Sequence, residues 1–228
     1  MSIGLIAAIA FVVGPTLAWL GIVSPLHGFL VFALGGLVAL LAGVAGVIRG
    51  IRGRGVGAGG VAAMLAAAVF VFIAVGSRGA PRINDYTTDL ADPPAFQHAT
   101  TLSPNAGRDL TYPPGFTAVQ QACCSDLRPA HLAVSPAEAF TRAQAAAARM
   151  PAWTVTHADP ASGTIEAVAT SRLFHFQDDI AIRVRPDGTG SRVDMRSKSR
   201  DGQGDLGVNA ARIRTFVAAL EAGAPTPP

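Results

Sequence analysis

The first 48 residues of the chain contain no aspartate, glutamate, lysine or arginine. Three apolar runs fill most of residues 1–76, and they occupy residues 4–23, 26–48 and 56–75. Each run is long enough for a helix to cross the roughly 30 Å of hydrocarbon in a bilayer, and soluble helices are rarely so long and free of charge. The sequence therefore predicts an α-helical membrane anchor of three spans over residues 1–76, with the lipid bilayer as its partner.

The loops beside these runs carry an orientation signal. The segment RGIRGRG, between the second and third runs, contains Arg49, Arg52 and Arg54, and arginines in short loops favour the cytoplasmic side. Arg78 and Arg82 on the far side oppose this orientation, but they are fewer. A signal peptide is disfavoured because the first run has no basic segment before it and no small-residue cleavage site after it. We therefore expect a cytoplasmic N-terminus, with everything after the third run outside.

Residues 77–114 are rich in proline, aspartate, threonine and asparagine, with DPP at 92–94 and YPPG at 112–115. Such sequences resist regular secondary structure. We expect an extended strap over this segment, in which Tyr86 and Phe96 supply apolar side chains that can pin it to the folded part.

Residues 115–228 carry the helix signals of an α+β domain. The motif SPAE, which starts at Ser135, combines an N-cap, a proline at the first helical position and a capping-box glutamate. The helix that follows ends before Pro151. A second helix is predicted over residues 209–222, with Asn209 as its N-cap.

Four segments between these helices have the alternation of β-strands, and they begin at Trp153, Thr164, Asp178 and Ser191. In the third segment, Ile180, Ile182 and Val184 alternate with polar or small residues, which indicates a sheet with one apolar and one wet face. The fold class is therefore α+β, an α-β-β-β-β-α domain with an antiparallel sheet. We expect helices on one face and an open, charged face opposite, where any function would be displayed.

Three blocks of sequence occur in order in this part of the chain: INDYTTDLADPPAF at 83–96, SRLFHFQDDIAIRV at 171–184 and VDMRSKSRDGQGDLGVNAARI at 193–213. Together they resemble the bacterial family known as domain of unknown function 1499, over about residues 81–220. The resemblance implies a membrane bundle ahead of the domain, but it implies no established activity. Its recurrent pattern falls on the following residues: Asp178, Asp179, Arg183, Asp194, Arg196, Ser197, Ser199, Arg200, Gly202, Asp205, Gly207, Asn209 and Arg212.

The block from Arg196 to Ile213 is a candidate site for binding a partner or an anionic ligand. Its glycines allow a loop that exposes N–H groups at the start of a helix, and an arginine beside such a loop can grip a carboxylate or phosphate. The candidate binding residues are Arg183, Arg196, Ser199, Arg200, Asp205, Asn209 and Arg212. The alternative is that the arginines pair with aspartates inside the domain. The sequence favours this structural alternative, because it has no phosphate-loop spacing.

The motif HFQDD offers residues for an enzyme, namely His175, Asp178 and Asp179. Either aspartate is a candidate general base for a hydrolase-like reaction on an anionic substrate. Neighbouring strand residues point to opposite faces, so we predict no shared metal ion. No G-x-S-x-G turn or other nucleophile context is present. We assign no catalytic residue and no cofactor to the preferred function, and keep the enzyme as the alternative.

Cys123 and Cys124 are adjacent and are the only cysteines of the chain. An oxidising compartment favours a disulfide, but a ring between adjacent cysteines forms only with local strain, which makes the bond easier to reduce. A redox pair is therefore one hypothesis. Two free thiols, or links between chains, are the alternatives, and together they are favoured.

The charge balance bears on the partners. From residue 81 onward the chain has fourteen basic and fifteen acidic residues, so we expect no nucleic acid, which requires a clustered basic face. We predict a multi-pass protein of the bacterial inner (cell) membrane with a periplasmic or extracellular domain. That domain is expected to bind an envelope protein or an anionic envelope ligand without catalysing a reaction.

Overall fold

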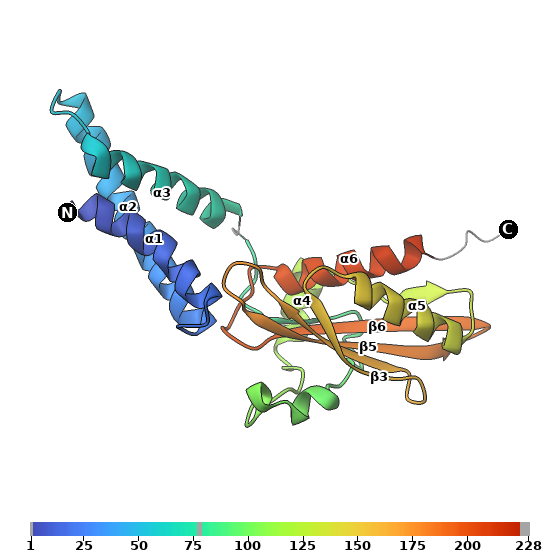
Figure 1. The fold of residues 1–228 in the computed structure, drawn as a ribbon. Helices are drawn as coiled ribbons and strands as arrows, with labels where there is room; N and C mark the ends of the chain where they lie inside the picture. Colours follow the sequence, from blue (N-terminus) through green and yellow to red (C-terminus); the bar gives the residue numbers. More distant parts are fainter. Residues whose placement is uncertain (1, 77–78, 224–228) are drawn as a thin grey trace. The chain divides into compact units, whose positions relative to one another are not determined.

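The computed structural model describes residues 2–76 and 79–223. The chain divides into two compact units, shown in Figure 1, which are described separately here. The first unit comprises Met1–Gly79 and the short segment Ser171–Phe176, and the second comprises Ala80–Thr170 and Gln177–Pro228.

The first unit contains three apolar helices: α1 (Ile3–Trp19), α2 (Pro25–Ile51) and α3 (Gly57–Gly76). By length and composition α2 and α3 are able to cross a membrane, whereas α1 is shorter, at 17 residues. The first run was expected to continue to residue 23, but the helix stops at Trp19 because Gly21 takes a left-handed conformation and Ser24 already caps α2. Two candidate spans and a shorter apolar helix are compatible with a membrane anchor.

Glycines explain how closely α1 and α2 pack. A Cβ atom on Gly14 would lie 2.5 Å from the carbonyl oxygen of Gly28, and one on Gly35 would lie 2.7 Å from the backbone nitrogen of Phe11. No larger residue fits at either position without moving the backbones apart. Close contact of this kind replaces the hydrophobic effect as a source of attraction between helices in lipid.

The second unit is built on one antiparallel sheet in the order β1-β6-β5-β4-β3, with β2 also paired to β6. The strands are β1 (Asp85–Thr87), β2 (Ala130–Leu132), β3 (Trp153–Asp159), β4 (Thr164–Thr170), β5 (Gln177–Asp187) and β6 (Gly190–Ser199). The mixed α+β class with an antiparallel sheet is confirmed, and so are the four predicted strands. The predicted order lacked β1 and β2, which have only three residues each and show no alternation to read.

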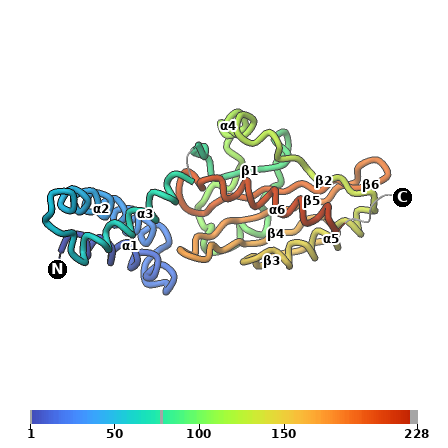
Figure 2. Tube along the Cα trace, turned by 90° about the horizontal axis from the view of Figure 1, so that it is seen from above, coloured from blue at the N-terminus to red at the C-terminus, as the bar shows by residue number. Residues whose placement is uncertain are grey.

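Three helices accompany the sheet: α4 (Phe116–Cys123), α5 (Pro136–Arg149) and α6 (Val208–Ala222). Helices α5 and α6 lie over one face, and α4 lies beside the β1 edge (Figure 2). Ile180 and Ile182 of β5 and Met195 of β6 point into the core under these helices, against Phe216 of α6. These side chains are almost completely buried, as the period-two pattern predicted.

The start of α6 differs from the prediction. The helix begins at Val208, so Asn209 is inside it and is not the N-cap. Gly207 occupies the N-cap position with φ 83°, where a side chain would be strained. The carboxylate of Asp205 does the capping instead, since it accepts hydrogen bonds from the backbone N–H groups of Gly207 (2.9 Å) and Asn209 (2.7 Å).

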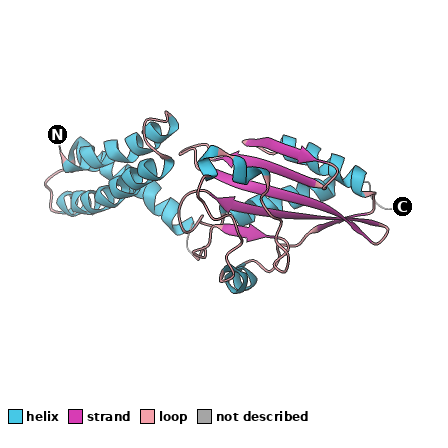
Figure 3. Ribbon diagram, turned by 90° about the horizontal axis from the view of Figure 1, so that it is seen from below, coloured by secondary structure: helices cyan, strands magenta, loops and turns pink. Residues whose placement is uncertain are grey.

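The opposite face of the sheet is covered by the segment that was expected to be a strap. Residues 88–112, which we call the covering segment, cross this face. They contain two short 3₁₀ helices, η1 (His98–Thr101) and η2 (Ser103–Asn105), as Figures 1 and 3 show. Tyr86 and Phe96 are buried and anchor the segment. The prediction of an open charged face was therefore wrong. Alternation shows which side of a strand is polar, but it does not show whether another segment covers that side.

Candidate functional site

A buried polar cluster joins the start of α6 to strands β5 and β6. The hydroxyl of Ser197 donates to the side-chain oxygen of Asn209 (2.6 Å), and the amide nitrogen of Asn209 donates to the hydroxyl of Ser199 (2.8 Å). Arg212 completes the cluster by donating to Ser197 (3.0 Å) and by pairing with Asp178 (2.6 Å). Each polar side chain of this cluster therefore has a partner inside the domain, as burial requires.

On the other face of the sheet, Arg196 and Asp85 form a two-pronged ion pair. The two carboxylate oxygens of Asp85 accept from Nε (2.9 Å) and Nη2 (2.7 Å) of Arg196, and Lys198 also lies 3.1 Å from the carboxylate. The Arg196 guanidinium lies 4.6 Å from the ring centroid of Phe96 and donates to the carbonyl oxygen of Leu110 (2.7 Å). Arg196 thus binds β1 through charge, and it binds the covering segment through ring and backbone contacts.

Asp179 forms the third cluster, on the same face as Arg196. It is completely buried and pairs with Arg200 (2.6 Å) and, more distantly, with Arg108 of the covering segment (3.4 Å). Arg108 also donates to the backbone carbonyl of Ser199 (2.9 Å). Asp178 and Asp179 therefore lie on opposite faces, as predicted, and each has an arginine as its partner.

Arg183 belongs to a fourth cluster, nearer the surface. It pairs with Asp92 of the covering segment (3.0 Å) and, at 3.5 Å, with Asp89 and Asp194. The neighbouring Arg185 pairs with the same three aspartates, and Arg192 pairs with two of them, Asp89 and Asp194. Each charge in this cluster is therefore balanced within the domain.

The chain also matches a known family over residues 85–220, which is more than half of its length. It belongs to the DUF1499 family of proteins of unknown function. The resemblance seen in the sequence is thereby confirmed. No curated protein and no solved structure matches the chain.

In this DUF1499 domain, the residues that carried the resemblance are largely those of the four clusters. These side chains bind one another: arginines pair with aspartates, and serine hydroxyls form hydrogen bonds with the Asn209 amide. The structure brings together Ser199, Asn209 and Arg212, but it places Arg196 and Arg200 on the other face of the sheet. The predicted binding residues thus form several internal networks and no single open site.

The residues of the enzyme alternative are also kept apart. His175 lies in the β4–β5 loop with a positive φ of 59°, while Asp178 and Asp179 point to opposite faces of β5. One hollow of the second unit lies between α5 and α6, and another lies beside β4 and β5; neither is lined by these three residues. Among the described residues, no group of three metal-ligating side chains occurs.

Two buried residues of the DUF1499 domain were missed at the sequence level. Glu166 of β4 accepts hydrogen bonds from the backbone N–H groups of Gln97 (2.7 Å), His98 (2.8 Å) and Ala99 (2.7 Å), and so caps η1. A single acidic residue in the apolar segment TIEAVAT was the available signal. No feature of the sequence indicated the role of the second residue, Gln120 of α4.

Gln120 acts as a substitute for a neighbouring strand. Its side-chain oxygen accepts from the Thr87 N–H (3.0 Å), and its nitrogen donates to the Thr87 carbonyl (2.6 Å). The oxygen also accepts from the hydroxyl of Tyr112 (3.1 Å). Through these bonds α4 closes the free edge of β1, where an unpaired backbone would otherwise be exposed.

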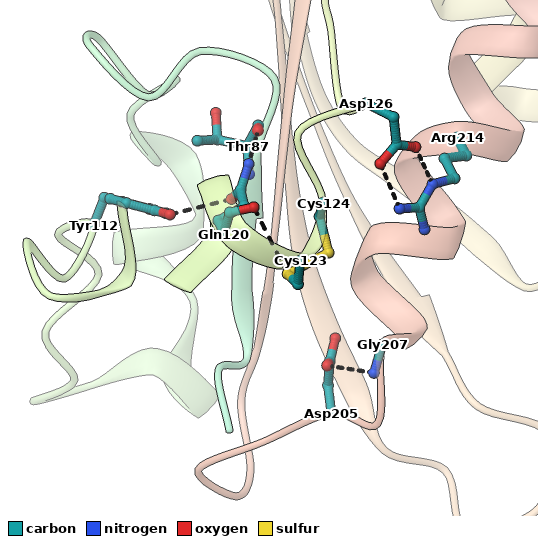
Figure 4. The surroundings of a disulfide bond; sticks show 9 residues. All are labelled: Thr87, Tyr112, Gln120, Cys123, Cys124, Asp126, Asp205, Gly207 and Arg214. Carbon is teal, nitrogen blue, oxygen red and sulfur yellow. Dashed lines mark hydrogen bonds and ion pairs between the residues drawn. A yellow bond between two sulfur atoms is a disulfide. The ribbon is translucent and has the colours of Figure 1, made fainter. Parts of the chain in front are cut away.

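Cys123 and Cys124 form a disulfide at the end of α4. Figure 4 shows it between α4 and the turn that carries Asp205 and Gly207. Cys123 is exposed, whereas Cys124 is buried in the core. The segment after the disulfide is held to α6 by the ion pair of Asp126 with Arg214, whose nitrogens lie 2.5 and 2.9 Å from the carboxylate oxygens.

Two ionisable groups near this turn have altered acidity. Burial raises the pKa of the Asp205 carboxyl above its usual value, although the N–H groups of Asn209 and Gly207 act in the opposite direction. Burial, and then the charge of Asp205, also raise the pKa of the Tyr86 hydroxyl. That hydroxyl is enclosed and has no hydrogen-bond partner among the described residues.

Proposed function

We propose that this DUF1499 protein is a membrane-anchored binding protein of the bacterial cell envelope. Its three N-terminal helices cross the inner membrane with the N-terminus in the cytoplasm, and its α+β domain lies outside and binds a partner protein. The arginines at the end of α2 and in the following loop support this orientation. The disulfide supports an oxidising compartment for the domain.

The partner surface is not the arginine network. Arg196, Arg200 and Arg212 are almost buried and already paired with aspartates. Binding an external anion would require breaking these pairs, and a buried charge that loses its partner costs several kcal/mol, about 3–5 for a broken pair.

One observation carries the proposal. The large exposed apolar side chains described in the second unit are Val119 of α4 and Leu206 and Val208 at the start of α6, with exposed fractions of 37%, 54% and 49%. Val119 belongs to α4, Leu206 to the turn that precedes α6, and Val208 is the first residue of α6. Figure 4 shows the disulfide between α4 and that turn. We call these three residues and Cys123 the α4–α6 patch. Large exposed apolar side chains are typical of surfaces that bind another protein, and those described in the second unit are confined to α4 and the start of α6.

Site-specific photocrosslinking in the native membrane tests this proposal. A photoreactive amino acid at position 119 is expected to give a discrete protein adduct, identified by mass spectrometry. The matched control is the same amino acid at the exposed Gln144 of α5, where no such adduct is expected. Adducts with lipid alone at position 119, or the same adducts at both positions, would contradict a partner protein at this patch.

A further inference from the structure

We propose that the Cys123–Cys124 disulfide is a thiol–disulfide exchange site, reduced by a dithiol protein that docks on the α4–α6 patch. This inference rests on the proposed function for its compartment and for the surface that receives the partner. It adds a chemical reaction, a class of co-reactant and a division of roles between the two sulfur atoms.

The disulfide is poorly placed to be a structural cross-link. A cross-link stabilises a protein mainly by restricting the loop between its ends in the unfolded chain, and the effect grows with the length of that loop. Cys123 and Cys124 are one residue apart, so their bond closes no loop and joins no distant segments. The ion pair of Asp126 with Arg214, and the hydrogen bonds of Gln120 with Thr87, already attach this region to α6 and β1.

The two cysteine residues differ in exposure, and this difference assigns which sulfur is attacked and which one leaves. Cys123 is exposed at the end of α4, whereas Cys124 is 7% exposed and packs in the core cluster that also contains Tyr86 and Leu127. A thiolate on another protein therefore reaches Cys123. Cys124 is buried behind Cys123, and its sulfur is therefore the leaving group.

The surroundings suit a protein co-reactant better than a small thiol. Val119 lies one helical turn before Cys123 on α4, and Leu206 and Val208 lie at the start of α6. All three are exposed, and apolar contact is what a docking protein adds to the reaction. A small, charged thiol such as glutathione gains little from such a surface.

The reaction balances without a further oxidant or reductant. A thiolate of the dithiol protein attacks Sγ of Cys123, the Cys123–Cys124 bond breaks, and Cys124 leaves as a thiolate that takes up a proton. The second thiolate of the partner then attacks its own sulfur in the mixed disulfide and releases Cys123, which also takes up a proton. The partner is oxidised to a disulfide, and this chain is reduced to two thiols.

Trapping the mixed disulfide in cells tests the assignment. In the Cys124→Ala variant the exposed Cys123 remains and has no neighbour to resolve a mixed disulfide. After acid quenching and thiol blocking, this variant is expected to run on a non-reducing gel as an adduct with one protein, which disappears on reduction. The matched Cys123→Ala variant keeps only the buried sulfur and is expected to lose the adduct. Equal adducts from both variants, or none from the first, would overturn the proposal.

A measurement on the purified wild-type chain does not depend on how these variants fold. The full chain in detergent is treated with dithiothreitol and then with iodoacetamide. After digestion, the mass of the peptide that contains both cysteines is measured by mass spectrometry. We expect two alkyl groups on the peptide. The ion pairs of the domain remain, so its thermal unfolding temperature should not change. A disulfide that dithiothreitol reduces only after denaturation would overturn the exchange site. Crosslinks at position 119 together with a resistant disulfide would leave the proposed function standing and remove only this inference.

Discussion

Arg196 shows how a charged residue at the centre of a sheet is kept stable. Its guanidinium is nearly buried, and removing such a charge from water is costly unless every hydrogen-bond donor finds a partner. Asp85 supplies two acceptors, Leu110 supplies a carbonyl, and Phe96 supplies the face of a ring. Leu110 and Phe96 belong to the covering segment and Asp85 to β1, so this one side chain helps to hold both on the sheet.

Replacing Arg196 with methionine is expected to lower the free energy of unfolding by about 3 kcal/mol, the lower end of the cost of breaking a buried pair. Lys198 remains 3.1 Å from Asp85 and partly compensates its charge. The measurement is chemical denaturation of the full chain in detergent, followed by the fluorescence of Trp153 with Trp19 replaced by phenylalanine.

The control for this substitution is Arg214→Met. Arg214 also makes a two-pronged pair, with Asp126, but both side chains are about half exposed. Exposed pairs contribute about 0–1 kcal/mol, so the control should change stability little. Equal losses from the two substitutions would show that burial does not determine the strength of these pairs.

Among the elements, the covering segment is the least regular and the most dependent on others. Its 3₁₀ helix η1 is too short to be stable alone. The Glu166 carboxylate of β4 satisfies three of the N–H groups at its start. A side chain from a strand thus fixes the position of a turn that is 67 residues away in sequence.

The Glu166→Ala substitution is expected to cost about 1–3 kcal/mol, because the N–H groups lose their acceptor and must turn to water. The loss should be local: residues around Gln97 should exchange amide hydrogens faster and become sensitive to protease, while β5 and β6 stay protected. Hydrogen exchange followed by mass spectrometry checks this. Glu138→Ala, at an exposed helix position, is the control and should leave the exchange of this segment unchanged.

The sequence predicted the elements that have strong local patterns. The alternation around Ile180 placed β5 and its inner face correctly, and the SPAE motif placed the start of α5 at Pro136. Local patterns fail where a contact joins distant residues. Nothing near Asp85 indicates that it meets Arg196, and nothing near Gln120 indicates that it pairs with the edge of β1.

The same limit applies to the candidate site. Charge, glycine content and spacing singled out the block from Arg196 to Ile213, and its residues do form polar clusters. Whether such residues bind an outside ligand depends on the segments that cover them. Asp85 and Leu110, which bind Arg196, and Arg108, which binds Asp179, all lie in a segment that composition alone described as an extended strap.

At the scale of the whole molecule, the order of charges along the chain predicts its topology in the membrane. Arg49 lies in the last turn of the long apolar helix α2, and Arg52 and Arg54 lie in the short segment between α2 and α3. In wild-type spheroplasts, external protease is expected to digest the domain that begins near residue 80. Replacing the three arginines with glutamine removes the bias of the positive-inside rule, so a fraction of the domains should become protected.

Immunoblotting with an antibody against the domain measures this protection. The control variant carries lysine at the three positions and keeps the charge, so its domain should be digested like that of the wild type. Full protection in the wild type would place the domain in the cytoplasm and contradict the proposed orientation.

The pairing of β1 with β6 also determines how late in synthesis the sheet can be completed. The Asp85 carboxylate binds the ammonium group of Lys198, and Lys198 is synthesised 113 residues after Asp85. At about 5–20 residues per second, a ribosome needs roughly 6 to 23 s to add that length. Until then β1 has no strand to pair with, and Asp85 has neither of its cationic partners. The nascent domain therefore completes its sheet only after its last strand has been synthesised, and until then β1 and the segment that follows it lack their contacts with β6.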